Sequence, residues 1–212
     1  MDKHATMTVL KKILKWALII GGGGFALCII SAIIYVIFIF SQFDSSSYKD
    51  LTENYELKSK EIFELKTFIN SIVPSNKSVD IEFDDNNTLG IFHVTEGGNY
   101  DSNWDVETNS GKADTLFQKI GWTTETLKTL KDKLDKANCI SVSNGDPCKI
   151  GFHRNGMGKY YYNVFSKPIA DSLKTTYNDS CTYILFKDNI VLEWGGGAIG
   201  NQCFPDLKNG GL

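Results

Sequence analysis

Cysteines are the residues of this sequence whose spacing predicts chemistry most directly. Apart from Cys28, they are Cys139, Cys148, Cys181 and Cys203. In an oxidising compartment, an even set of this kind predicts two disulfides, for which three connectivities exist. Closure of the shortest loops favours Cys139–Cys148 and Cys181–Cys203, but a simple turn at Asn144-Gly145 would not bring Cys139 opposite Cys148. The pairing therefore stays open.

Histidine supplies the other candidate chemistry. Beyond the N-terminal tail the sequence has only His93 and His153, each in a strand-like pattern beside aromatic residues. No C-x-x-C, G-x-S-x-G or H-E-x-x-H motif accompanies them. We therefore predict no catalytic residues, no metal site and no cofactor. The alternative is a membrane-bound enzyme that uses His93 or His153 for acid–base work.

Two segments contain residue types found in calcium-binding or phosphate-binding loops, but neither has the complete motif. Residues 101–107 begin like a calcium loop, but Val106 replaces the required glycine and Lys112 falls where the bidentate glutamate belongs. This excludes an EF-hand and leaves a looser calcium site open. Residues 195–200 could cradle a phosphate only if a helix followed them. We predict instead a flexible loop closed by Cys203.

Residues 160–162 are three consecutive tyrosines. Strand alternation would direct Tyr160 and Tyr162 to one side and Tyr161, with Phe165, to the other. We expect one set in the core, and the other either in cross-strand pairs or on a face that binds a protein or glycan partner. The polar loops expected at 96–111 and 195–200 are the other candidate contact sites.

An uncharged run at residues 16–43 is the strongest feature of the element pattern. About 20 apolar residues suffice to cross a membrane as a helix. Four lysines lie within residues 1–15, so the positive-inside rule assigns this basic tail to the cytoplasm. The sequence thus predicts a single-pass anchor in contact with membrane lipid. It places the protein in the cell membrane, with an extracytoplasmic or periplasmic C-terminal domain.

Two stripes of residues predict self-association of a longer helical rod. Within 16–43, small residues at every fourth position would let two helices approach closely: Gly24, Cys28 and Ala32. Residues 44–74, the predicted helical stalk, repeat apolar residues at spacings of three and four, as in a coiled coil: Leu51, Tyr55, Ile62, Leu65, Ile69 and Ile72. A homo-oligomer would use both stripes. Alternatively, the stalk stripe packs on the chain's own domain.

Residues 75–212 are predicted to form one domain of ordinary size. Short strands are expected at 79–83, 89–94, 139–143, 149–154, 159–165, 182–187 and 190–194, and helices at 112–120, 123–137 and 168–177. The predicted fold class is α+β. It combines an N-terminal transmembrane helix, a helical or coiled-coil stalk and a largely antiparallel sheet with two or three short helices.

The charge balance argues against nucleic acid as a partner. The whole chain has a formal charge of −3. Residues 1–15 contribute +3, from four lysines and Asp2, so the rest of the chain carries −6. A nucleic-acid surface would need to be basic. We expect a membrane-anchored, disulfide-stabilised domain outside the cytoplasm that binds or scaffolds a partner and performs no chemistry.

In its order of parts the sequence resembles type IV pilins and pseudopilins. An apolar N-terminal helix, a soluble helix, an antiparallel sheet and a C-terminal disulfide loop would follow one another in the same order. Gly24-Phe25 also has the residue types of a prepilin cleavage site. The resemblance implies a filament subunit. The residues before Gly24 are apolar rather than basic, however, and Ile29 occupies the position of the expected glutamate.

Overall fold

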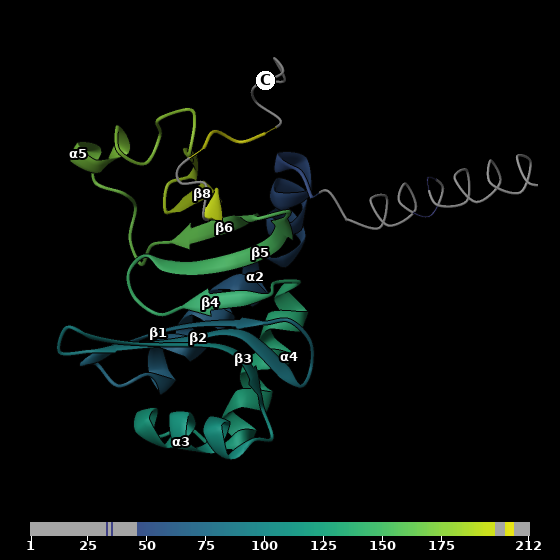
Figure 1. The fold of residues 1–212 in the computed structure, drawn as a ribbon. Coiled ribbons are helices and arrows are strands. Elements are labelled where there is room, and N and C mark those ends of the chain that lie inside the picture. Colours follow the sequence, from purple (N-terminus) through teal and green to yellow (C-terminus); the bar gives the residue numbers. More distant parts are fainter. Residues whose placement is uncertain (1–32, 34, 36–45, 198–201, 206–212) are drawn as a thin grey trace, which may run out of the picture. The chain divides into compact units, whose positions relative to one another are not determined.

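An eight-stranded antiparallel sheet forms the centre of the unit that spans Ser45–Leu212 (Figure 1). The computed structural model describes Ile33, Tyr35, residues 46–197 and residues 202–205. Met1–Asp44 forms a separate unit. The strand order is β3-β2-β1-β4-β5-β6-β8-β7. The strands are β1 (Lys77–Phe83), β2 (Thr88–Glu96), β3 (Asn99–Glu107), β4 (Ser141–Ser143), β5 (Cys148–Asn155), β6 (Gly158–Val164), β7 (Tyr183–Lys187) and β8 (Ile190–Gly195).

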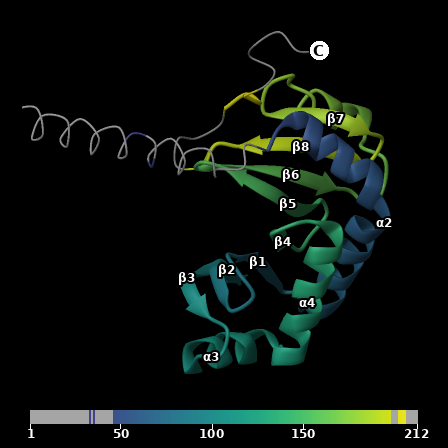
Figure 2. The ribbon, with the colours of Figure 1, turned by 90° about the vertical axis from the view of Figure 1, so that its right-hand side faces the viewer.

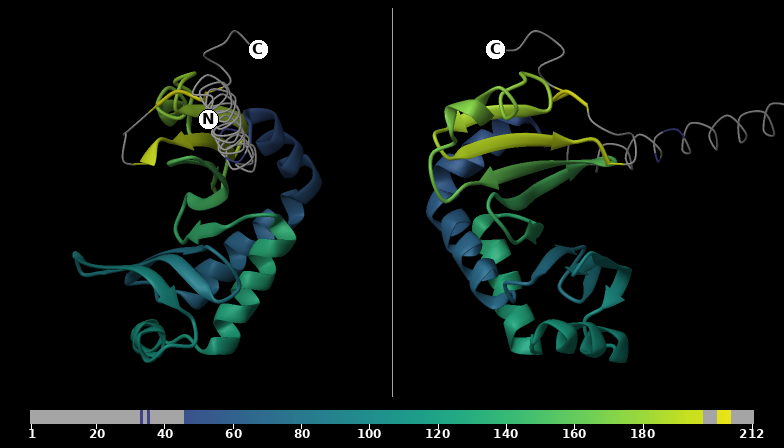
Figure 3. Two further views of the ribbon diagram at one scale, coloured as in Figure 1. Left: turned by 45° about the vertical axis from the view of Figure 1, so that its right-hand side comes forward. Right: turned by 90° about the vertical axis from the view of Figure 1, so that its left-hand side faces the viewer.

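Three helices pack on one face of this sheet. These are α2 (Tyr48–Ile72), α3 (Gly111–Ile120) and α4 (Thr124–Ala137); a fourth, α5 (Asp171–Lys174), is a single turn. Figures 2 and 3 show α2 and α4 side by side on the same side of the strands. Phe117 of α3 meets Phe92 of β2 on this face. The opposite face of the sheet has no extensive contact with a helix among the described residues.

Helix α2 has its own N-terminus. Ser47 is the N-cap, with an extended backbone, and it forms a reciprocal capping box with Asp50. This pattern satisfies donors that only the first turn of a helix leaves free. The helix ends at Ile72, with Val73 as its C-cap, and Pro74 follows, which cannot continue a helix. Thus α2 is a helix in its own right, not the continuation of a preceding one.

The side of α2 that faces the sheet is part of the hydrophobic core. Leu51, Ile62 and Leu65 are fully buried there. Polar side chains fix the same side: Asn54 donates to the Ala137 carbonyl and to the Tyr162 hydroxyl. Such contacts to α4 and β6 join the helix to the sheet along its length.

The predicted fold class is wrong in its overall plan. The stripe assigned to a stalk seam lies in the core, where Leu51, Tyr55, Ile62, Leu65 and Ile69 are buried and Ile72 packs against it. The structure is a mostly antiparallel sheet with few helices, and the stalk is one of its layers. Burial against the sheet removes this stripe from water, which stabilises the packed arrangement.

The predicted membrane-spanning segment finds no counterpart among the described helices. None of those helices is both long enough and apolar enough to cross a membrane. Gly24, Cys28 and Ala32, and nearly all of residues 16–43, lie outside the described residues.

Two segments differ in detail from the expectation. The loop expected at 96–111 contains β3, an edge strand whose main chain pairs with β2 from Glu96↔Asn99 to Thr88↔Glu107. The helix expected at 168–177 is reduced to α5. The other predicted strands and helices are present, with ends within a few residues of those expected. Gly121 is the C-cap of α3 and Thr123 the N-cap of α4, both residue types that favour these positions.

Candidate functional site

The sheet face opposite the helices carries a continuous row of polar and aromatic side chains. The strand register places eight residues directly opposite one another across the whole sheet: Trp104, Ile91, Glu82, Ser141, Gly151, Tyr161, Glu193 and Tyr183. A second row runs beside it: Ser102, His93, Asp80, Ser143, Lys149, Asn163, Val191 and Leu185. Alternation sends both rows to the same face. We call this surface the open face.

Glu82 is the centre of an ion-pair cluster on the open face. Its side chain is 2% exposed and accepts from Arg154 Nε at 2.5 Å and Nη2 at 3.0 Å. Lys159 Nζ donates to the second carboxylate oxygen at 2.5 Å. Burial raises the pKa of Glu82, but the charges of Lys159 and Arg154 and their hydrogen bonds outweigh it, so the pKa lies below its ordinary value. Glu82 is therefore ionised in the folded protein.

Gly151 makes room for this cluster. The Lys159 side chain passes over Gly151, where a Cβ would lie 3.1 Å from Lys159 Cδ and 2.0 Å from Ser141 Oγ. Lys159 Nζ also donates to Ser141 Oγ at 2.8 Å. Burial lowers the pKa of Lys159, and the charge of Glu82 opposes this shift. The empty side-chain position at Gly151 is what lets the ammonium reach its two acceptors.

A second ion pair lies along the same face. Lys149 Nζ donates to Glu193 at 2.6 Å, and Asn163 donates to the other oxygen of that carboxylate at 2.8 Å. Lys149 and Lys159 both lie over the Tyr161 ring, at 4.0 and 4.7 Å from its centroid. Burial raises the pKa of Tyr161, so it stays a neutral phenol. These contacts hold the side chains of three strands in one arrangement.

His93 occupies the β2–β3 end of the open face. Its Nδ1 lies 2.5 Å from the Tyr100 hydroxyl and its Nε2 lies 3.0 Å from Ser102 Oγ. The ring also meets Trp104 edge-on, with centroids 4.9 Å apart. Burial lowers the pKa of His93, against a weaker opposing effect of Asp80. His93 thus orders the aromatic side chains of the edge strand.

A pocket of about 660 Å³ lies on the open face beside the Glu82 cluster. Its walls come from β2 and β3 on one side and from the β5–β6 hairpin and the end of β8 on the other: Ile91, Trp104, Arg154, Gly156, Met157, Lys159, Tyr161, Gly195 and Gly197. β4 has only three residues, which lets β1 and β5 exchange side-chain contacts past its end. Trp104 is 56% exposed and the Arg154 side chain 43% exposed. The pocket thus offers a cation and an aromatic ring to solvent.

The four cysteines beyond residue 138 behave differently from the two-disulfide expectation. Cys181 and Cys203 form a disulfide, whereas Cys139 and Cys148 are buried thiols. The register of β4 and β5 places these two thiols beyond opposite ends of their ladder, because Ser141 faces Gly151 and Ser143 faces Lys149. Burial raises the pKa of the Cys148 thiol to about 12 and raises that of Cys139 further. Of the two pairs that short loops favour, the structure contains Cys181–Cys203 and not Cys139–Cys148, so these four cysteines form one disulfide instead of the expected two.

Several other sequence-predicted residues lie apart from the pocket. His153 contacts Phe152 at the β5 bulge, on a different side from His93. Asp101 lies in strand β3, not in a calcium loop. Its carboxylate accepts hydrogen bonds from Asn103 of the same strand and from Lys119 of α3. Tyr160 and Tyr162 are buried in the core, as one of the two alternation sets was expected to be, and Tyr161 is on the open face. No group of three metal-binding side chains occurs in the described part of the chain.

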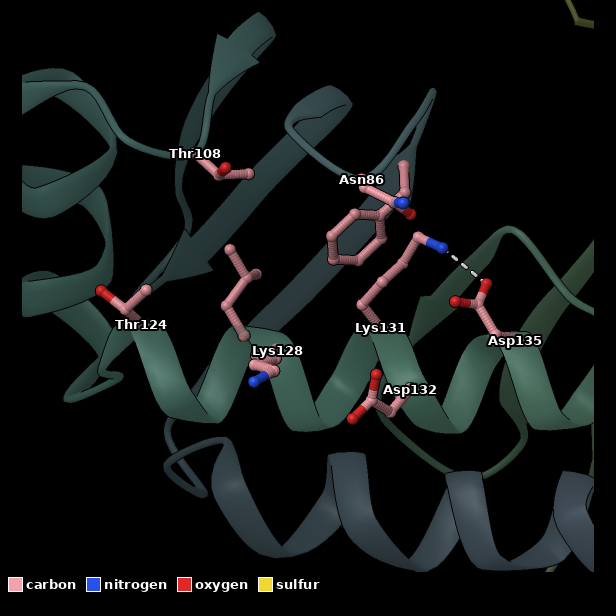
Figure 4. Close-up of a pocket in the computed structure, with 9 residues that line it drawn as sticks. Asn86, Thr108, Thr124, Lys128, Lys131, Asp132 and Asp135 are labelled. Atoms are coloured by element: carbon pink, nitrogen blue, oxygen red, sulfur yellow. Dashed lines mark hydrogen bonds and ion pairs between the residues drawn. The ribbon is translucent and has the colours of Figure 1, made fainter.

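A second pocket, of about 360 Å³, lies on the helical side (Figure 4). Phe83 and Leu127 form its apolar lining, and Asn86 and Thr108 face α4 across it. Lys131 bends toward Asp135, 2.5 Å away. Its other two charged residues, Lys128 and Asp132, are exposed on the same helix, so its charged groups are those of a solvated helix face and need no ligand.

Sequence reasoning missed most of the residues that form the open face, although it named His93 and Tyr161. The usable signal was strand alternation: Asp80 and Glu82, then Lys159, Tyr161 and Asn163, occupy alternate positions. Arg154 is also the one arginine in the sequence. The strand order brings Glu82, Arg154 and Trp104 together, and no local sequence pattern predicts that order.

No protein-family model, curated protein or solved structure matches this chain.

Proposed function

We propose that residues 45–212 form a non-catalytic binding domain that uses the open face to hold a ligand outside the cytoplasm. The observation that carries this proposal is the pocket beside Glu82. Its charged walls are fixed in place by a buried carboxylate, while Arg154 and Trp104 remain accessible. A rigid site with a few converging polar groups and aromatic walls is typical of ligand-binding pockets.

Binding is favoured over catalysis by the surroundings of the histidines. Ser102 and His93 are within hydrogen-bond distance, which is one part of an activated nucleophile. The other ring nitrogen of His93, however, meets a phenol instead of a carboxylate. A Ser–His nucleophile also needs a group that stabilises the developing imidazolium. The pair is better suited to holding Tyr100 and Trp104.

An extracytoplasmic location is part of the proposal. The Cys181–Cys203 disulfide is typical of proteins in oxidising compartments. The basic tail before the uncharged run at 16–43 favours the same orientation. In this proposal that run tethers the domain at the cell membrane and is in contact with membrane lipid.

Footprinting on cells whose cytoplasmic membrane is intact tests both the extracytoplasmic location and the binding role of the open face. A membrane-impermeant lysine reagent should modify Lys136, which is exposed on α4. Hydroxyl radicals should oxidise Trp104 less on cells than in the purified full-length chain, while Leu57 on α2 reacts equally in both. Unmodified Lys136 would contradict the location, and equal oxidation of Trp104 would contradict an occupied open face.

A filament subunit is the alternative that the order of parts suggests. It is supported by a helix packed across an antiparallel sheet and by a C-terminal disulfide. The Ser47 cap favours the first proposal, because it starts α2 afresh where a pilin helix would run on. N-terminal sequencing of the mature protein separates the two: a chain that begins before Trp16 rules out processing at Gly24-Phe25.

A further inference from the structure

The charges of the open-face pocket define what kind of ligand it accepts. Among the described residues, the titratable groups of its walls are Arg154, Lys159 and the neutral phenol of Tyr161. The carboxylate of Glu82 lies beneath them, and both of its oxygens are engaged. Asp84 is near enough to interact with Arg154 but does not line the pocket. The wall therefore presents positive charge to a ligand.

Arg154 keeps donors available for that ligand. A guanidinium has five N–H groups, of which Nε and Nη2 use one each on Glu82. The Nη1 edge makes no hydrogen bond within the described part of the chain. Since Glu82 already fixes the plane of the guanidinium, a bidentate acceptor such as a carboxylate meets a preorganised partner.

Trp104 and Gly156 add a second requirement. Trp104 is 56% exposed and lines the same pocket as Arg154, and C–H groups with partial positive charge pack well on the face of such a ring. Gly156 lines the opposite wall, and nothing lies within 4 Å of the place where its side chain would be, so the main chain is open there. Backbone groups there can exchange hydrogen bonds with hydroxyls.

We propose that this pocket binds a uronate residue of an acidic polysaccharide, with its carboxylate on the free N–H groups of Arg154 and its ring on Trp104. The proposal rests on the proposed function of the open face as a binding surface. A sugar acid combines the three features required: one carboxylate, an apolar ring face and several hydroxyls. A volume of 660 Å³ lies within the range of about 300–1,000 Å³ found for small-molecule pockets.

Calorimetry on the purified full-length chain in detergent tests this ligand class. The probes are short oligogalacturonate and oligomannuronate, with the neutral oligogalactan and oligomannan of equal length as controls. At least one uronate should bind, and its neutral counterpart should bind about 10-fold or more weakly, the effect of one charge-assisted hydrogen bond. Binding should also quench tryptophan fluorescence.

Variants separate a direct role from a loss of fold. Arg154→Gln should remove the preference for the uronate, Arg154→Lys should keep part of it, and Trp104→Ala should weaken charged and neutral sugars alike. Lys136→Gln, a charge change on the helical side, should leave binding unchanged. Because Arg154→Gln could disturb Glu82, circular dichroism of each variant is compared with the parent, and the Trp104→Ala result stands independently.

Three outcomes overturn the inference, and only the last of them also contradicts the proposed function. Charged and neutral sugars could bind equally, with both weakened by Trp104→Ala. That result would show that the pocket binds sugars but does not recognise the carboxylate. Absence of sugar binding, with Trp104 still protected on cells, would show that the open face holds another ligand. Trp104 oxidised equally on cells and in the purified chain would contradict the proposed function itself.

Discussion

At the scale of single residues, the open face shows how charged side chains are accommodated on a sheet face that none of the described helices covers. Glu82 and Lys159 are almost fully removed from solvent, yet each has opposite charge and hydrogen bonds within reach. Desolvation of an ion is costly unless its partners compensate for it. The cluster tolerates this because Gly151 gives the Lys159 stem a path across the strands.

Gly151→Ala should destabilise the domain by about 1–3 kcal/mol, the usual cost of overpacking. Its Cβ would displace Ser141 and Lys159 and pull the ammonium away from Glu82. Urea unfolding measures the change. The matched control is Gly111→Ala at the start of α3, where nothing lies within 4 Å of the added methyl. That change should be neutral or stabilising, and an equal loss in both variants would contradict the role given to Gly151.

His93 should make stability depend on pH. Its pKa is lower in the folded protein than in the unfolded chain, so the unfolded chain takes up the proton first as pH falls. The free energy of unfolding should therefore decrease as pH drops through about 6.5 and level off below the folded pKa. Thermal melts between about pH 7.5 and about pH 5.5 measure this slope.

His93→Gln serves as the control for that slope, because glutamine can still hydrogen-bond Tyr100 and Ser102 but does not titrate. The paired carboxylates whose pKa is lowered, such as Glu82, titrate at more acidic pH and do not interfere. A melting profile with the same slope in His93→Gln as in the parent chain would assign the pH dependence to another group.

At the scale of elements, α2 shows that one apolar stripe fits two structures. Spacings of three and four suit a coiled-coil seam and a helix packed on its own sheet equally well. Polar residues beside the stripe favour packing of the helix on its own sheet. Lys66, inside the helix, donates to the Val164 carbonyl at 2.8 Å and to Asp146 at 3.0 Å. Both acceptors belong to the sheet and its loops.

Ile62→Ala should cost about 2–5 kcal/mol in the free energy of unfolding, because it empties a fully buried site in the core. Leu57→Ala is the matched control on the same helix: Leu57 is 79% exposed, and its change should stay within about 0.5 kcal/mol. Chemical denaturation at two protein concentrations gives both values. A loss in Ile62→Ala that depends on protein concentration would point to a stalk between protomers instead.

Strand β3 is the element for which local sequence is least informative. Its residues are mostly polar, and asparagine, aspartate and glycine in and around it are typical of turns. The pairing with β2 overrides that preference, since main-chain hydrogen bonds run along the whole strand. An edge strand with one wet face tolerates polar residues on it. The missed strand is also the one that supplies Trp104.

At the scale of the whole molecule, labelling of the cysteines tests both the burial of two thiols in the fold and the oxidising compartment that a disulfide implies. Without reductant, a Cys28→Ser chain should show no labelled thiol when native and two when unfolded in denaturant, namely Cys139 and Cys148. Reduction before unfolding should raise the number to four. Mass spectrometry after alkylation counts the labels. Four labels without reductant would mean that the Cys181–Cys203 bond does not form and would remove support for an oxidising compartment.

The sequence by itself determined most strands and helices, the caps at Gly121 and Thr123 and the split of the tyrosines between two faces. These follow from periods of two and 3.6 residues and from local capping chemistry. Only the tertiary structure decided that the stalk stripe is core, that Cys139 and Cys148 stay apart, and that Trp104, Arg154 and Glu82 meet. The physical reason is that these outcomes depend on strand order and register, which arise from burial summed over the whole sheet. No single segment encodes that sum.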